Sequence, residues 1–289
     1  MPIFPKSLPA NARRAKAATA TATKGELFLV GGKDGRNEDN VLIDRFAHLC
    51  GGKSARVLVI TSASDTPQIH RQEYSEAFRK AGVREVSVFH PKERAASDDP
   101  KLLSSLDRAH GVYFSGGGQR RLMGVMGGTR FEERLKERHR HGLHIAGTSA
   151  GASAMSQVMI AQGKGRKSIQ SSSVELDTGF GLLPEIIVDQ HFQQRERFGR
   201  LIAAVLRNPA MLGFGLDEGT AVAIDASGTG TVFGKGALSI VDGSKLVAAN
   251  AGGSNASDRL LAFAGMRLHV LTEGWTFDLG SREAKPPGG

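Results

Sequence analysis

Cysteine is almost absent from this chain of 289 residues, and long apolar runs are missing altogether. Cys50 is the only cysteine, so the chain has no internal disulfide and no zinc site built from cysteines. No apolar stretch approaches the roughly 20 residues that a membrane span needs. We therefore expect no membrane partner, and a reducing compartment, the cytoplasm, as the location.

Acidic residues are absent from the first 25 positions, and this explains most of the basic charge. The formal net charge is +9, and five basic side chains in residues 1–25 leave only +4 for the rest. A nucleic-acid-binding protein needs a basic face on its folded part, so we expect no nucleic-acid partner. Residues 1–24 also lack the apolar core of a secretory signal and are predicted to be a flexible basic leader.

Short apolar runs alternate with longer amphipathic stretches through the first half of the chain. Strands are expected at 26–30, 56–61, 85–89, 111–114 and 143–147. A stretch with helical periodicity or a turn into one follows each of them. This pattern predicts an α/β fold with a mostly parallel sheet and helices on both faces. Such sheets hold their ligands at the carboxyl ends of the strands.

The pattern changes after an apolar strand at 185–192 and a helix that reaches residue 206. Short strands with Gly, Asn and Asp turns follow, and they predict an antiparallel C-terminal extension of the same sheet. No Pro-rich or charged linker precedes them. Residues 25–280 are therefore interpreted as a single α/β catalytic domain, and 281–289 as a flexible tail.

Ser149 lies between two glycines in Gly147-Thr148-Ser149-Ala150-Gly151, directly after an apolar run. This G-x-S-x-G pattern is typical of a nucleophile held in a strained strand-to-helix turn. The N–H groups that follow, at the start of a helix, would face a developing oxyanion. The same residues also suit a tight packing turn without chemistry, and the pattern alone leaves both interpretations open.

A nucleophilic serine needs a base and an acid. His191 ends the strand in "IIVDQHF" and is expected at the same sheet edge as Ser149. "GLDEGTA" offers Asp217 and Glu218 at another strand end. The cluster His139, His141 and His144 does not have the spacing of a helical zinc pair and is interpreted as a solvated helix end.

Arginine and glycine segments flank these residues. Arg195, Arg197 and Arg200 follow His191, either as a solvated helix face or, at the mouth of a site, as carboxylate receptors. The glycine-rich turn "FSGGGQ" would supply a second oxyanion N–H, from Gly117, and would bring Gln119 to the substrate.

Taken together, these segments resemble the cyanophycinases, serine peptidases that degrade multi-arginyl-poly-aspartate and share one family with the aspartyl dipeptidases. The resemblance extends from about Lys24 to Leu279 through "GTSAGA", "GGGQ", "DQHF", "RERFGR" and "GLDE". It implies a fold similar to the class I glutamine amidotransferases (flavodoxin-like) and a homodimer. This chain departs from the family pattern at two positions. Gly118 precedes the glutamine in place of an acid, and Gly219 follows the catalytic acid in place of Asn or Asp.

The resemblance also implies a role for each matching residue. Ser149 would be the nucleophile, His191 the base and Glu218 the acid, with oxyanion donors at Gly117 and Ala150. The substrate-binding residues would be Gln119, Asp189, Gln190, Arg195, Arg197 and Arg200. Among these, the arginines would bind carboxylates and Asp189 would pair with an arginyl group. The product would be β-aspartyl-arginine, and neither a metal nor an organic cofactor is implied.

Other functions compete with this one. An aspartyl dipeptidase would use the same residues on a small peptide. An α/β-hydrolase esterase would run in the order Ser149, Asp217 and His269. A binding protein would keep the pocket without hydrolysis, and a nucleic-acid binder would depend on the leader. The loop with Lys164, Arg166 and Lys167 is expected either to cover the site or to be a plain surface loop.

Overall fold

The computed structural model describes residues 23–163, 169, 173–249 and 260–288. Within them, a nine-stranded sheet has a parallel core. The core strands, in spatial order, are β3 (Glu85–Phe89), β2 (Arg56–Ile60), β4 (Gly111–Phe114), β5 (His144–Thr148) and β1 (Leu27–Val30). Antiparallel strands β10 (Thr220–Ile224), β11 (Thr229–Gly234), β16 (Thr276–Asp278) and β17 (Glu283–Lys285) continue the sheet beyond β1. The predicted α/β class with a parallel core and antiparallel additions is confirmed.

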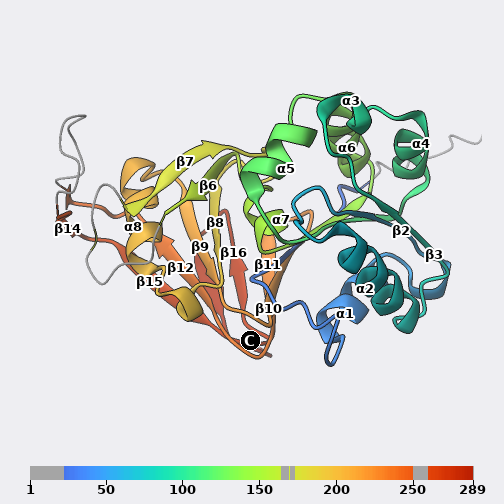
Figure 1. Cartoon of the computed structure of the whole chain (residues 1–289). Coiled ribbons are helices and arrows are strands. Elements are labelled where there is room, and N and C mark those ends of the chain that lie inside the picture. Colours follow the sequence, from blue (N-terminus) through green and yellow to red (C-terminus); the bar gives the residue numbers. More distant parts are fainter. Residues whose placement is uncertain (1–22, 164–168, 170–172, 250–259, 289) are drawn as a thin grey trace, which may run out of the picture.

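Helices cover both faces of the parallel strands (Figure 1). On one face lie α1 (Val41–Leu49) and α2 (Pro67–Lys80). On the other lie α4 (Pro100–Arg108), α5 (Gln119–Met126), α6 (Arg130–Arg140) and α7 (Ala150–Ser153), with the short α3 (Arg94–Ser97) beside α5. Alternation in β1 produces this arrangement: Phe28 and Val30 pack under α1 and α2, whereas Leu27 and Leu29 face the other core. A 3₁₀ turn, η1 (Gly52–Ser54), leads into β2.

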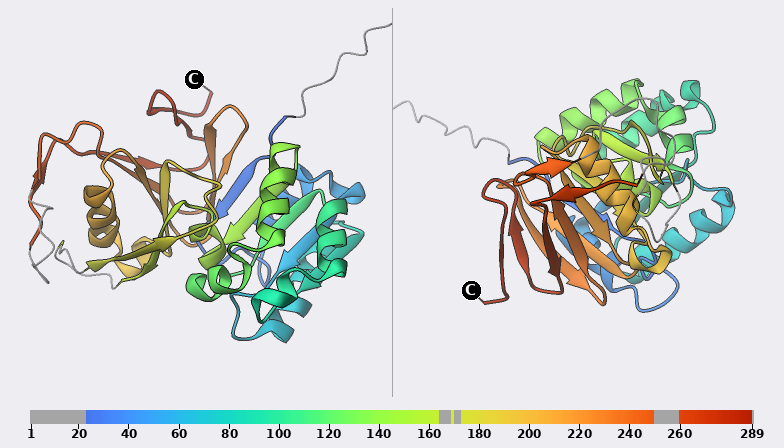
Figure 2. Two further views of the ribbon diagram at one scale, coloured as in Figure 1. Left: turned by 90° about the horizontal axis from the view of Figure 1, so that it is seen from above. Right: turned by 90° about the vertical axis from the view of Figure 1, so that its left-hand side faces the viewer.

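A second sheet contains four strands among the described residues, in the order β15 (Arg267–Leu271), β12 (Leu238–Asp242), β9 (Leu212–Leu216) and β8 (Ile186–Gln190). Helix α8 (Phe198–Arg207) covers its outer face, as both views of Figure 2 show. Its inner face packs on the antiparallel part of the first sheet, where the rings of Phe214 and Phe277 lie 6.2 Å apart. The predicted antiparallel C-terminal extension of the sheet is confirmed for β10, β11, β16 and β17, but not for β9, β12 and β15, which pair in a second sheet with β8.

Two short hairpins complete the described structure: β6 (Val158–Gln162) with β7 (Glu175–Thr178), and β13 (Ala248–Ala249) with β14 (Phe263–Ala264). The expected flexible tail also needs correction, because residues 283–285 form β17. Arg282 secures this end of the chain by donating to the buried Asp242 carboxylate at 2.6 Å. Most of the predicted leader, residues 1–22, lies outside the described residues, as do Lys164, Arg166 and Lys167.

The two sheets meet where the site is formed. The N–H of Ser149, after β5, donates to the carbonyl of Val30 at 2.9 Å, and the N–H of His191, after β8, donates to that of Gly31 at 2.7 Å. The sequence predicts that His191 lies at the same sheet edge as Ser149. The structure instead places His191 after a strand of the second sheet, and it reaches Ser149 beside the end of β1. Among the helices of the described residues, none is long and apolar enough to cross a bilayer.

Candidate active site

Ser149 occupies a strained turn between β5 and α7. Its φ of 52° and ψ of −112° lie outside the regions that non-glycine residues favour, at a cost of about 1–3 kcal/mol. Both flanking glycines are needed for close packing. A Cβ on Gly147 would lie 2.4 Å from the carbonyl carbon of Gly151, and one on Gly151 would lie 2.4 Å from the carbonyl oxygen of Phe114. The strain at the serine is more than the packing-turn interpretation requires, because a glycine there would avoid it.

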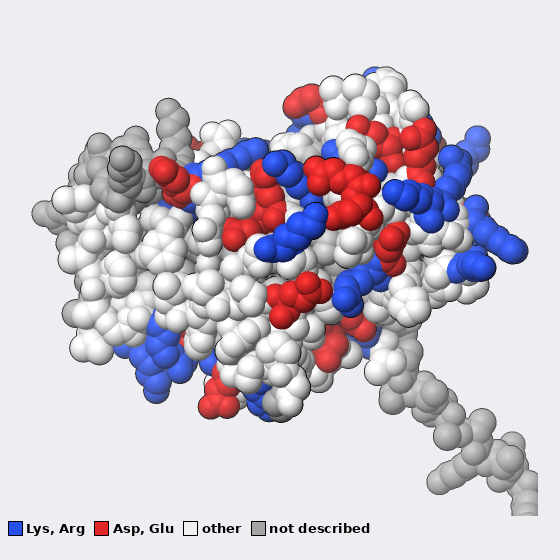
Figure 3. Space-filling model, turned by 90° about the horizontal axis from the view of Figure 1, so that it is seen from below, with Lys and Arg blue, Asp and Glu red and all other residues white. Residues whose placement is uncertain are grey.

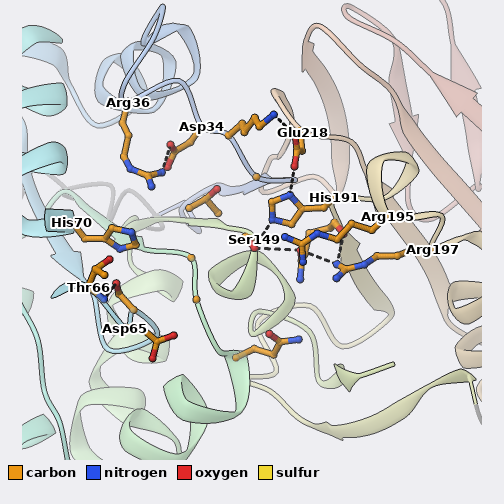
Figure 4. Close-up of a pocket in the computed structure, with 18 of the residues that line it drawn as sticks. Asp34, Arg36, Asp65, Thr66, His70, Ser149, His191, Arg195, Arg197 and Glu218 are labelled. Carbon is orange, nitrogen blue, oxygen red and sulfur yellow. Dashed lines mark hydrogen bonds and ion pairs between the residues drawn. The ribbon is translucent and has the colours of Figure 1, made fainter. Parts of the chain in front are cut away.

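The structure brings Ser149, His191 and Glu218 into one hydrogen-bonded row (Figure 4). The Ser149 Oγ lies 2.9 Å from His191 Nε2, and His191 Nδ1 lies 2.7 Å from Glu218 Oε1. Lys33 holds the other carboxylate oxygen, with its Nζ 2.8 Å from Oε2. This is the geometry in which a serine is deprotonated by an imidazole that a carboxylate orients.

The surroundings keep the imidazole neutral and the carboxylate charged. Burial lowers the pKa of His191, Glu218 opposes that change, and the nearby Arg195 adds to it. For Glu218, burial alone would raise the pKa, but the hydrogen bonds from Lys33 and His191 hold it below its usual value. At neutral pH Nε2 of His191 is therefore available to accept a proton.

The alternative order of serine, Asp217 and His269 is not supported by this geometry. The Asp217 carboxylate accepts the N–H groups of Gln193 and Ala237, each at 3.1 Å. His269 lies in β15 of the second sheet, with its ring 5.5 Å from that of Phe277. Both residues serve the packing of the second sheet.

The sequence predicts that the N–H groups of Gly117 and Ala150 hold an oxyanion, and this stays a prediction. Within the described residues, neither the Gly117 nor the Ala150 N–H donates a backbone hydrogen bond. Gly116 lies against Ser149, where a Cβ on it would be 3.3 Å from the serine Cβ. Gly117 has a φ of 139°, and a Cβ there would lie 1.9 Å from the carbonyl oxygen of Ala63, so only glycine fits the turn.

The arginine segment differs from both interpretations offered above. It does not form one helix face: Arg195 ends a 3₁₀ turn, η3 (Gln193–Arg195), Arg197 is the N-cap of α8, and Arg200 is buried in the first turn of α8. Asp189, expected to bind a substrate arginyl group, is fully buried in β8. Arg200 holds both oxygens of its carboxylate, and Arg197 lies 3.5 Å from one of them. That expectation is therefore wrong, because the chain's own arginines already neutralise Asp189.

The remaining predicted substrate-binding residues differ in whether their side chains already have polar partners within the described residues. Arg195 is exposed at the cleft and has no ion-pair partner within the described part of the chain. Gln119 lines the cleft, but its amide nitrogen donates to the carbonyls of Ile160 and Ala161 in β6, at 2.9 and 3.1 Å. Gln190 accepts from Ser149 Oγ at 3.2 Å and from Arg197 Nη1 at 2.9 Å.

Sequence reasoning missed one wall of this cleft, whose volume is about 970 Å³. Arg36 and His70 line that wall, and both pack on the ring of Tyr74. The buried Asp34 carboxylate anchors it by accepting both tyrosine hydroxyls of the chain, those of Tyr74 and Tyr113, at 2.8 Å. The sequence does hold one signal for these residues, which is their position. Arg36 follows the carboxyl end of β1 and His70 follows that of β2, where ligands of such sheets bind.

Two further sequence expectations can be placed. His139 is buried and its Nδ1 lies 2.9 Å from the Leu143 carbonyl, so it is not a solvated helix end. Gly219 has a φ of 66°, a left-handed conformation that Asn and Asp also tolerate, and this explains why the departure leaves the turn intact.

Among the described residues, no group of three His, Cys, Asp or Glu side chains is placed to hold a metal ion.

Charge on the outer surface is mixed. On the face seen in Figure 3, acidic and basic side chains lie interspersed, and the basic ones of the described residues form no continuous area there. This face therefore gives no support to a nucleic-acid-binding role.

Known proteins are similar to this chain over most of its length. The model of peptidase family S51 matches residues 27–232. The cyanophycinase of Trichormus variabilis is 37% identical over 276 residues, which cover 95% of this chain and 92% of the relative. That of Synechococcus elongatus is 35% identical over 263 residues, covering 91% and 81%. The crystal structure of a peptidase from an acI-B1 Actinobacterium, 21% identical, shares the fold with a TM-score of 0.65 over 90% of this chain and 98% of that one.

Proposed function

Because the chain belongs to peptidase family S51, we propose that it is a serine exopeptidase that hydrolyses cyanophycin, multi-arginyl-poly-aspartate, to β-aspartyl-arginine. The observation that carries the proposal is the row of Ser149, His191 and Glu218 at the floor of a cleft that carries both charges. The polymer also carries both charges, as guanidinium and carboxylate groups. The names of the relatives support this substrate.

The proposed reaction is acyl transfer in two steps. His191 Nε2 takes the hydroxyl proton while Ser149 Oγ attacks an amide carbonyl of the aspartate backbone, and Glu218 stabilises the imidazolium that forms. The N–H groups of Gly117 and Ala150 hold the oxyanion, each worth about 2.7–4 kcal/mol in comparable sites. His191 then protonates the leaving amine, and the acyl group stays on the serine as an ester.

Hydrolysis of that ester completes the cycle. Water enters as the amine leaves, His191 takes one of its protons, and collapse of the second tetrahedral intermediate releases the carboxylic acid and restores the hydroxyl of Ser149. Arg195 is the candidate for binding a substrate carboxylate during both steps, because its guanidinium is open to the cleft. The homodimer and the cytoplasmic location expected from the sequence stay predictions.

A substrate panel with two histidine variants tests this function against its competitors. Wild type, His191→Ala and His269→Ala would be assayed on cyanophycin, on an α-aspartyl dipeptide and on 4-nitrophenyl acetate. We expect polymer cleavage by wild type and His269→Ala, and none by His191→Ala. Cleavage of the dipeptide alone would identify an aspartyl dipeptidase, and cleavage of the ester alone, lost in His269→Ala, would identify an esterase.

A further inference from the structure

The hydroxyl of Ser149 has two acceptors within reach. His191 Nε2 lies 2.9 Å from its Oγ, and Gln190 Oε1 lies 3.2 Å from it on another side. A hydroxyl has one hydrogen, so it can donate to only one of them. Attack on a carbonyl requires the hydroxyl to donate this hydrogen to His191, which acts as the base. The state of the Gln190 amide therefore bears on how often the serine is ready to react.

Arg197 controls that amide. Its Nη1 donates to Gln190 Oε1 at 2.9 Å and also to the Gln190 carbonyl oxygen. The guanidinium is itself fixed, because it lies 3.5 Å from the buried Asp189 carboxylate and the arginine as a whole is only 9% exposed. The arginine thus keeps the amide oxygen, rather than the NH₂ group, beside the serine, and occupies part of its acceptor capacity.

A receptor for a substrate carboxylate should have an exposed charge without a counter-ion, whereas Arg197 is buried beside the Asp189 carboxylate. Burial lowers the pKa of Arg197 to about 10, which still leaves it charged at neutral pH. Its charge lies beside Asp189, and its Nη1 donates to both oxygens of Gln190. Arg195, two residues earlier, is exposed and has no such partners within the described residues.

We propose that Arg197 is a positioning residue that acts on Ser149 through Gln190, and that Arg195 alone in this segment receives a substrate carboxylate. The proposal rests on Ser149 being the nucleophile of the proposed function. Arg197 orients the Gln190 amide so that its oxygen fixes the Ser149 Oγ, while the hydroxyl hydrogen stays with His191. Without Arg197, the amide can turn its NH₂ group toward Oγ or accept the hydrogen more strongly, and either change opposes attack.

A small fluorophosphonate without carboxylates tests this role separately from substrate binding. The reagent phosphonylates an activated serine as fluoride leaves and the serine proton passes to the base, so its rate reports on Ser149 itself. We expect Arg197→Met to slow phosphonylation on the order of 10- to 100-fold, the range for a misplaced reactive group. The matched control Arg134→Met, an exposed arginine of α6 that does not line the cleft, should react as fast as wild type, and Arg197→Lys should recover part of the loss.

Steady-state kinetics on the polymer should divide in the same way. Arg197→Met should lower kcat with little change in KM, whereas Arg195→Met should raise KM. Arg200 still holds both oxygens of Asp189 in the Arg197→Met variant, so the fold should tolerate the change, as thermal unfolding would show. Gln190→Met offers a second route that leaves Asp189 untouched.

A double-mutant cycle decides whether Arg197 acts through Gln190. If it does, Arg197→Met combined with Gln190→Met should be no slower toward the fluorophosphonate than the slower single variant. Additive losses, or an Arg197→Met variant that reacts like wild type, would overturn the proposal while leaving the proposed function intact. A wild-type protein that does not react at Ser149 would overturn both.

Discussion

Replacing Glu218 by glutamine should damage the site more than the loss of one charge, because Lys33 decides which way the new amide points. The Lys33 ammonium lies 2.8 Å from Oε2 and requires an acceptor there. In Glu218→Gln that acceptor can only be the amide oxygen. The NH₂ group then faces His191 Nδ1, which lies 2.7 Å from Oε1 in the native site. A donor at this position forces the imidazole proton onto Nε2, where it faces Ser149 and blocks the base.

The expected loss has two parts. The charge term follows from an ion pair about 4 Å apart at an effective dielectric of ~20, which is worth about 4 kcal/mol, or roughly three orders of magnitude in rate. The partial exposure of Glu218, at 17% of its side chain, reduces this term. The wrong tautomer adds to it, and an Asp-to-Asn change in a serine protease triad lowers kcat by about 10⁴ for that reason. We expect a loss of roughly 10³- to 10⁴-fold.

Single-turnover hydrolysis of the polymer by Glu218→Gln, with and without Lys33→Met, separates the two parts. Once Lys33 is absent, the amide is free to turn its oxygen toward His191, so the double variant should be faster than Glu218→Gln alone. Lys33→Met by itself should lose little activity, because the lysine is 67% exposed. A Glu218→Gln variant with more than about a tenth of wild-type activity would refute the role of the carboxylate. A double variant no faster than the single would refute the role of Lys33.

Three further predictions follow from single residues. Because burial lowers the pKa of His191 and catalysis needs its neutral form, kcat/KM should be constant at neutral pH and fall only as the pH drops below about 6.5. A pH profile of kcat/KM with its midpoint above that value would contradict this prediction. Ser149→Gly should abolish activity yet raise the free energy of unfolding by about 1 kcal/mol relative to Ser149→Ala, since glycine accepts a φ of 52°, and equal urea midpoints for the two variants would refute the strain. Burial opposes ionisation of Asp242, but hydrogen bonds from Ser244, Arg282 and Arg267 bring its pKa to about 2. The ionised form therefore adds about 2 kcal/mol to the free energy of unfolding above pH ~4, and this contribution is lost as the pH falls toward 2. The difference in unfolding free energy between wild type and Asp242→Asn should accordingly disappear at low pH, and a difference that does not change with pH would contradict this.

The row of Ser149, His191 and Glu218 could be predicted from the sequence more readily than the residues that hold it in place. Ser149 sits in a local pattern with its own physical meaning, and the rule that ligands bind at strand ends brought His191 and Glu218 into consideration. What local patterns cannot show is pairing between distant segments. The sequence of β9, with alternating glycines, does not say which strands it joins, and it pairs with β8 and β12 in a second sheet.

Burial explains the residues that were misinterpreted. Asp189 stands in β8, all five residues of which are buried, so its carboxylate had to find a cation inside the protein. Arg197 and Arg200, eight and eleven residues later, supply it, and the segment that looked like a row of receptors is mostly internal support. The wall with Arg36 and His70 carries no motif, and only the packing on Tyr74 brings the two together.

Incubation of insoluble cyanophycin with wild type and with Ser149→Ala tests the central claim most directly. Turbidity would follow the loss of polymer, and mass spectrometry would identify the soluble product. We expect wild type alone to clear the suspension, with β-aspartyl-arginine as the product. A suspension that neither protein clears would contradict the proposed substrate, and clearing by both would contradict Ser149 as the nucleophile.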